Sequence, residues 1–135
     1  MENITTLSYL RFFIGGYFGS NSEVILNKKT VTYHTDESSY SNGFKHKKKI
    51  SPENLEIFIL KLNEIKLSEW DDEYVSDTLD GEQWELRLTF NGKKKKGIFG
   101  SNCYPSQGSK SYERTGEFDE FLDALSQLIK EPNFF

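Results

Sequence analysis

The stretch Gly81 to Pro105, GEQWELRLTFNGKKKKGIFGSNCYP, decides the fold because it holds the clearest strand and the clearest turn of the chain. Polar and apolar residues alternate from Gln83 to Phe90, which is the pattern of a strand with one buried and one solvent-exposed face. Asn91-Gly92 follows, and this dipeptide favours a two-residue type I′ turn because both of its residues tolerate positive φ. The stretch therefore predicts a β-hairpin.

A two-residue turn also predicts the register of that hairpin. The expected pairs are Phe90 with Lys93, Leu88 with Lys95, Leu86 with Gly97 and Trp84 with Phe99. This register puts Lys95 on the apolar face, where a charged group without a partner is costly. Three explanations remain open: the lysine snorkels at the end of the sheet, a bulge near Gly97 shifts the register, or the site is a binding groove.

The residues before the hairpin predict four strands and a helix. Strands are expected over residues 6–14, 23–26, 30–34 and 44–50. The last of them carries Lys45, Lys47, Lys48 and Lys49, which suits a solvent-exposed edge strand. Ser51-Pro52 then begins a helix, because serine is a good N-cap and proline fits the first helical position. Apolar residues at helical spacing continue this helix to about Lys66.

The residues after the hairpin predict a polar loop and a second helix. The run Ser106 to Ser111 has no apolar period and is expected to form a mobile loop. Thr115 or a neighbour caps a helix whose apolar stripe runs from Phe118 to Ile129, and Pro132 ends it. The order of four strands, helix, two strands and helix predicts a single α+β domain over residues 1–135. Its two helices pack on a mostly antiparallel sheet of about six strands.

Composition indicates a folded domain. The 135 residues include 11 Phe, 7 Tyr and 2 Trp, and these bulky side chains can fill a core. The first residues lack the basic start and the apolar run of a signal peptide, and no stretch is long enough to cross a membrane. The single cysteine, Cys103, excludes an internal disulfide and fits a reducing compartment. We therefore expect a cytoplasmic protein that makes no membrane contact.

Charge is segregated along the chain, although the formal net charge is only −4. No basic residue lies between Lys66 and Arg87. The acidic residues of that interval are Glu69, Asp71, Asp72, Glu73, Asp77, Asp80, Glu82 and Glu85. The basic residues gather at Lys28-Lys29, from Lys45 to Lys49 and from Lys93 to Lys96. Such blocks create local fields that steer partners of opposite charge.

Several positions in the second half of the chain form a recurring pattern. They are Trp70, Asp80-Gly81, Trp84-x-Leu86 and Gly100-x-Asn102-x-Tyr104-Pro105. With them the chain resembles a loose group of small, largely uncharacterised bacterial proteins, over roughly residues 50–129. The resemblance implies a sheet with a long helix, and it brings no activity or catalytic residue with it.

Motifs for nucleophilic catalysis and for metal binding are weak. Cys103 has only His34 and His46 as imidazole bases, and neither lies in a recognisable cysteine-hydrolase context. No pair among these three residues has the short spacing of metal ligands. We therefore expect a protein without enzyme activity, cofactor or metal.

A resemblance to metal-dependent nucleases is also weak. Asp80, Glu85 and Arg87 are similar to the D…E-x-K arrangement that holds magnesium in those enzymes, but arginine replaces the lysine. Glu85 and Arg87 are two residues apart on the same exposed strand face. A surface ion pair is the simpler interpretation.

The acidic connection and the loop Gly100 to Ser111 are the candidate partner-binding surface. Carboxylates flanked by aromatic side chains suit an interface that covers a basic site on a partner. The expected contact residues are Glu69, Trp70, Asp71, Asp72, Glu73, Tyr74, Asp77, Asn102 and Tyr104. In size, acidity and lack of catalytic motifs the chain is similar to immunity proteins, which neutralise a cognate toxin. The leading hypothesis is therefore an immunity-type or inhibitory protein that binds a protein partner, such as a toxin or effector.

The lysine runs support nucleic-acid binding as the alternative hypothesis. Lysines neutralise phosphates, and exposed aromatic rings stack on bases. The aromatic residues interleaved with the runs are Tyr40, Phe44, Phe90 and Phe99. The acidic net charge and the expected burial of these rings argue against this alternative.

Overall fold

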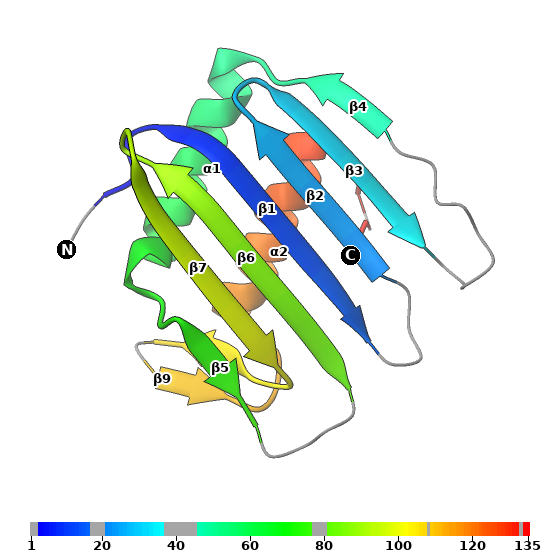
Figure 1. Ribbon diagram of the computed structural model, residues 1–135, viewed down its shortest axis with the longest axis vertical. Coiled ribbons are helices and arrows are strands. Elements are labelled where there is room, and N and C mark those ends of the chain that lie inside the picture. Colours follow the sequence, from blue (N-terminus) through cyan, green and yellow to red (C-terminus); the bar gives the residue numbers. More distant parts are fainter. Residues whose placement is uncertain (1–2, 17–20, 37–45, 77–80, 108, 133) are drawn as a thin grey trace.

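The computed structural model describes residues 3–16, 21–36, 46–76, 81–107, 109–132 and 134–135. These residues form a seven-stranded sheet, a two-stranded sheet and two α-helices, which confirms the predicted α+β fold. Figure 1 looks onto one face of the large sheet, with both helices behind it. The described helices therefore cover only one face, called here the covered face, and the other is the exposed face.

The large sheet is almost entirely antiparallel. Its strands are β1 (Leu7–Gly16), β2 (Asn21–Asn27), β3 (Thr30–Asp36), β4 (His46–Lys49), β5 (Glu73–Val75), β6 (Glu82–Phe90) and β7 (Lys94–Ser101). Their spatial order is β4-β3-β2-β1-β6-β7-β5. Among the described strands, only β5 and β7 pair in parallel. The predicted hairpin, β6 with β7, thus lies between the long strand β1 and the short edge strand β5.

Both α-helices begin where the sequence predicts. They are α1 (Pro52–Glu64) and α2 (Gly116–Ile129), and a short 3₁₀ helix η1 (Leu67–Glu69) follows α1. Ser51 Oγ accepts a hydrogen bond from the Asn54 backbone N–H at 3.2 Å, and Thr115 Oγ1 accepts one from Phe118 at the same distance. Each cap satisfies a backbone donor that has no partner within its helix. Helix α2 ends at Lys130, which adopts the left-handed conformation with φ 57°.

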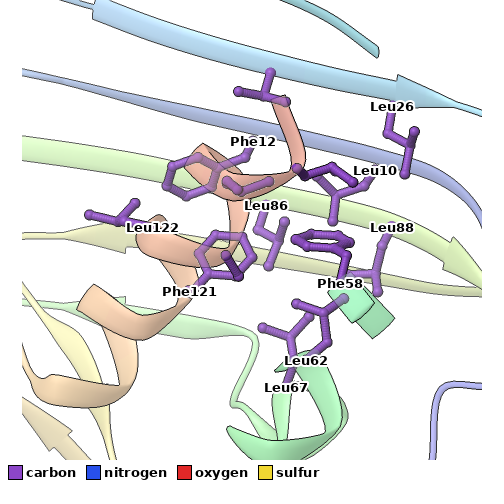
Figure 2. Close-up of a cluster of buried hydrophobic side chains, with 14 of the residues drawn as sticks. Leu10, Phe12, Leu26, Phe58, Leu62, Leu67, Leu86, Leu88, Phe121 and Leu122 are labelled. Atoms are coloured by element: carbon purple, nitrogen blue, oxygen red, sulfur yellow. The ribbon is translucent and has the colours of Figure 1, made fainter. Parts of the chain in front are cut away.

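The core fills the space between the covered face and the two helices. Figure 2 shows Phe12 and Leu86 from the sheet close to Phe121 from α2, with Phe58 and Leu62 reaching in from α1. The rings of Phe12 and Phe121 pack edge to face, with their centroids 5.0 Å apart. Such aromatic pairs add to the stabilisation that comes from area burial alone.

Two segments that the sequence predicts to be irregular contain short strands. The acidic connection holds β5, where the Phe99 N–H donates to Asp72 O and the Ser76 N–H donates to Ser101 O. The polar run after the hairpin takes part in a second sheet, formed by β8 (Tyr104–Ser106) and β9 (Ser109–Ser111). Strands of three residues are too short to show an alternating pattern, so the sequence carried no usable signal for them.

The predicted register of the hairpin is wrong by one residue. The observed pairs are Phe90 with Lys94, Leu88 with Lys96, Leu86 with Ile98 and Trp84 with Gly100. Asn91 and Gly92 do adopt positive φ, but Lys93 also belongs to the turn. The shift therefore arises at the turn and not from a bulge near Gly97. It moves Lys95 to the exposed face and puts Lys96 on the covered face.

Candidate functional site

Trp70 and Gly100, two residues of the recurring sequence pattern, lie against the fully buried indole of a third, Trp84. The ring of Tyr74 stacks on it at 5.9 Å, and the ring of Trp70 packs edge to face at 6.4 Å. Its Nε1 donates a hydrogen bond to Cys103 O at 3.0 Å. A Cβ on Gly100 would lie 2.0 Å from that same nitrogen, so only glycine fits there. These positions therefore build one corner of the core.

Asn102 and Tyr104, both predicted contact residues, hold the start of β6 in place. Asn102 adopts φ 51°, and its Oδ1 accepts a hydrogen bond from the Glu82 N–H at 2.8 Å. The Tyr104 hydroxyl donates to Glu82 Oε1 at 2.8 Å, while its ring packs on Phe118. Burial, together with this hydrogen bond, raises the pKa of Tyr104 to about 12. The Arg114 guanidinium also pairs with Glu82. The Tyr104 side chain thus faces inward.

Strand β5 divides the predicted acidic surface into two parts. Tyr74 points into the core and is only 2% exposed, and its hydroxyl accepts a hydrogen bond from the Asp71 N–H at 2.8 Å. Trp70 is buried as well. Asp71 lies on the side of the helices, and Glu73 pairs with Phe99 on the exposed face of the sheet. Asp72 lies between them, 3.9 Å from the Lys96 ammonium group, and also lines the depression over β6 and β7. The carboxylates of one sequence block therefore reach two different surfaces.

The first surface is a groove of about 510 Å³ between the end of α1, η1, β8 and the start of α2. We call it the acidic groove. Ile65, Trp70, Tyr74 and Pro105 contribute its apolar walls. Five carboxylates, Glu64, Glu69, Asp71, Glu117 and Glu120, line it together with one cation, Lys66. The sequence predicted Glu69 and Asp71 but missed the other three, because they come from α1 and α2 and join only in the folded chain.

Two of these carboxylates have partners within the described residues. Glu64 lies 3.4 Å from Lys61 Nζ, and Glu117 accepts a hydrogen bond from the Gln107 N–H. The remaining three, Glu69, Asp71 and Glu120, form no ion pair with any other residue of the described part of the chain. The groove is therefore a concentrated and largely uncompensated negative surface, which attracts cations.

The second surface is a shallow depression of about 710 Å³ over β6 and β7 on the exposed face. Tyr9, Arg87, Lys95 and Phe99 line it, with Asp72, Glu73 and Glu85 beside them. Phe99 is 42% exposed, so its expected burial is wrong, whereas that of Phe90 is confirmed. The register error hid this surface, because it assigned Lys95 and Phe99 to the covered face.

Strand alternation also separates the lysines of each run. Lys47 and Lys49 lie on the exposed face, opposite Thr32 and Thr30 of β3. Lys48 points the other way and donates to Ile129 O at 2.8 Å and to Glu131 Oε1 at 3.1 Å. Neither run is therefore a uniform basic surface. The predicted residues Tyr40, Phe44, Lys45, Asp77 and Asp80 lie outside the described residues.

The described residues hold no group of three or more His, Cys, Asp or Glu side chains arranged to bind a metal ion. The Cys103 thiol is fully buried. None of the described helices is both long and apolar enough to cross a membrane. Comparison with protein-family models and with curated proteins gives no match.

Proposed function

We propose that this protein is a non-catalytic, immunity-type or inhibitory protein that binds a basic surface of a protein partner through the acidic groove. The observation that carries the proposal is the gathering of five carboxylates from separate segments around one apolar-walled groove with a single lysine. Charge of this kind speeds the encounter with a basic partner and discriminates against acidic ones.

Two hydrogen bonds hold the wall of the groove in place, which supports a binding role. Trp70 Nε1 donates to Ile65 O at 3.2 Å, and the Lys96 ammonium donates to Trp70 O at 2.5 Å. A surface that is already ordered loses less conformational entropy when a partner binds. Trp70 and Tyr74 therefore contribute as supports of the groove wall, while the carboxylates make the proposed contacts.

We restrict the proposed contact set to the carboxylates of the acidic groove. Glu69 and Asp71 remain in it and are joined by Glu64, Glu117 and Glu120. Asp72, which lies beside Lys96, and Glu73, which opens onto the exposed face of the sheet, do not line the groove and leave this set. Because the contacts come from several segments, a partner must recognise the folded protein and not a linear peptide of it.

The test is capture of partners by the tagged full chain from a lysate of the organism that encodes it, with nuclease treatment and mass spectrometry. The groove variant Glu69→Lys with Glu120→Lys is compared with Glu56→Lys with Glu113→Lys, a control that makes the same charge change at exposed positions outside the groove. We expect a nuclease-resistant basic protein that the groove variant loses and the control retains.

Both variants should keep the melting temperature of the parent, since exposed substitutions away from partners change stability little. The purified partner is then titrated at rising salt, where a charge-driven association slows markedly. Equal capture by the groove variant and the control, or a partner that nuclease removes, contradicts the proposal.

A further inference from the structure

The exposed face of the large sheet carries a positive band that is not visible in the sequence. Two adjacent rows of directly paired residues cross β4, β3, β2, β1, β6 and β7 in that order. The first row is Lys49, Thr30, Asn27, Tyr9, Thr89 and Lys95. The second row is Lys47, Thr32, Ile25, Arg11, Arg87 and Gly97. We call these two rows the basic band. They contain three lysines, two arginines and no carboxylate.

Three carboxylates, Glu23, Glu85 and Glu73, lie in the next row, and the first two pair with the arginines of the basic band. Arg11 and Arg87 are directly opposite each other on β1 and β6, an arrangement of like charges that costs stability unless it is compensated. Arg11 pairs with Glu23 at 2.7 Å, and Arg87 pairs with Glu85 at 2.5 Å. Each guanidinium group therefore has a carboxylate partner on the sheet surface.

The lysines at the two ends of the basic band remain available. Lys47 and Lys49 on β4 and Lys95 on β7 form no ion pair with another residue of the described part of the chain. They are separated by five strand spacings of about 4.8 Å, or about 24 Å in all. Positive charge therefore lies at both ends of a surface that spans six of the seven strands of the sheet.

Aromatic rings lie within and beside the basic band. Tyr9 belongs to it, and Phe13 and Phe99 lie in the neighbouring row on β1 and β7. Phe99 is 42% exposed. Gly97 stands between Phe99 and Lys95 on β7, and a Cβ there would meet nothing within 4 Å. The missing side chain leaves open space in the depression beside the Phe99 ring.

From this arrangement we infer that the exposed face binds a single-stranded nucleic acid, laid across the strands from β4 to β7. Its phosphates contact Lys47, Lys49 and Lys95, and unpaired bases stack on Tyr9 and Phe99. Cations that follow a backbone, with rings on which bases stack, are the features of surfaces that bind single strands. The exposed rings favour a single strand over a duplex, because the faces of the bases are covered in a duplex.

Much of the negative charge lies away from the basic band, although Glu23, Glu85 and Glu73 stand beside it in the row of Phe99. The acidic groove lies on the side of the helices, beyond the core, and the Debye length at physiological ionic strength is only about 8 Å. The inference goes beyond the proposed function and concerns the opposite face of the molecule. An experiment that refutes the proposed function therefore does not refute this inference, and the reverse also holds.

The test measures fluorescence anisotropy of labelled oligouridine and oligothymidine with the full chain, titrated from low to physiological salt. The variant Lys47→Ala with Lys49→Ala removes two phosphate contacts and should reduce the slope of log K against log salt by about 1.4. The control Lys61→Ala with Lys110→Ala removes the same charge from α1 and β9 and should leave affinity and slope unchanged.

A further variant, Phe99→Ala, separates stacking from charge. Loss of one base stack should weaken binding at least about fivefold at an unchanged salt slope. Because the ring is exposed, this variant should melt with the parent protein, which is checked in the same experiment. No binding at low salt, equal effects of the band and control variants, or equal affinity for a duplex overturns the inference. Equal competition by polyglutamate, which would indicate an acidic peptide ligand, also overturns it.

Discussion

The ammonium group of Lys96 donates a hydrogen bond to the backbone carbonyl of Trp70 at 2.5 Å and lies 3.9 Å from the Asp72 carboxylate. Its side chain is only 15% exposed. A lysine on the covered face of the sheet thus ties β7 to the connection that forms one wall of the acidic groove. The Lys96 ammonium group therefore has its partners within the fold, and its role is structural.

We predict that Lys96→Met destabilises the fold by about 1–3 kcal/mol, because the Trp70 carbonyl loses its donor while the aliphatic part of the side chain is kept. Urea unfolding of the variant measures the loss. Lys95→Met is the matched control, since Lys95 is exposed on the other face of the same strand and should change stability by less than about 0.5 kcal/mol. Equal effects of the two substitutions would show that the hydrogen bond contributes nothing.

Two glycines of β7 should respond in opposite ways to alanine. A Cβ on Gly100 meets the Trp84 indole at 2.0 Å, so Gly100→Ala must displace a fully buried ring and should cost about 1–3 kcal/mol or more. A Cβ on Gly97 meets no atom within 4 Å, and neither glycine has positive φ. Gly97→Ala should therefore be neutral or stabilising by up to about 1 kcal/mol. Thermal melting of both variants measures these changes in stability. A Gly100→Ala protein as stable as the parent would refute the packing argument.

Asn102 combines a left-handed backbone with a side-chain acceptor for the Glu82 N–H. Asn102→Gly keeps the backbone conformation but loses the acceptor, and should cost about 1 kcal/mol. Asn102→Ala also has to place a Cβ in the left-handed region, which adds about 1–2 kcal/mol. Chemical denaturation should thus rank the proteins as parent, glycine variant and alanine variant in falling stability. The reverse order of the two variants would remove the conformational argument.

The contact of Glu131 with Lys48 and Tyr33 predicts a pH dependence. Hydrogen bonds from Lys48 and then Tyr33 hold the pKa of Glu131 below its ordinary value of 4.5. A carboxyl group whose pKa is lowered by folding stabilises the protein above that ordinary value, and the contribution is lost as the pH falls through the folded pKa. Glu131→Gln should therefore lower the melting temperature at pH 7, and the difference should shrink on acidification.

Lys48 sets the upper end of the pH range in which this contact stabilises the fold. Hydrogen bonding with Tyr33 and Glu131 raises its pKa above 10.5, so its contribution is complete below that value and is lost at higher pH. The control for the Glu131 measurement is Glu56→Gln on the exposed side of α1, which should change the melting temperature at neither pH. A Glu131→Gln difference that persists unchanged at low pH would contradict the assignment.

The recurring pattern shows how far a sequence motif can be interpreted. Three of its residues, Trp70, Asn102 and Tyr104, are also predicted contact residues. In the folded protein they surround Trp84 and the start of β6. Large aromatic residues and a left-handed asparagine serve packing and turns at least as often as contact, and the one-dimensional pattern does not separate the two uses.

The sequence by itself determined both helices, the existence of the β6–β7 hairpin and the alternation within the long strands. These features depend on neighbours in the chain, such as the caps Ser51 and Thr115 and the apolar periods. Only the tertiary structure decided which face each residue of the hairpin occupies, because one additional residue in the turn exchanges the two faces of a strand. It also decided that carboxylates from α1, η1 and α2 share a groove and that lysines of β4 and β7 share a row. Both arrangements depend on contacts between segments far apart in sequence, which no local pattern encodes.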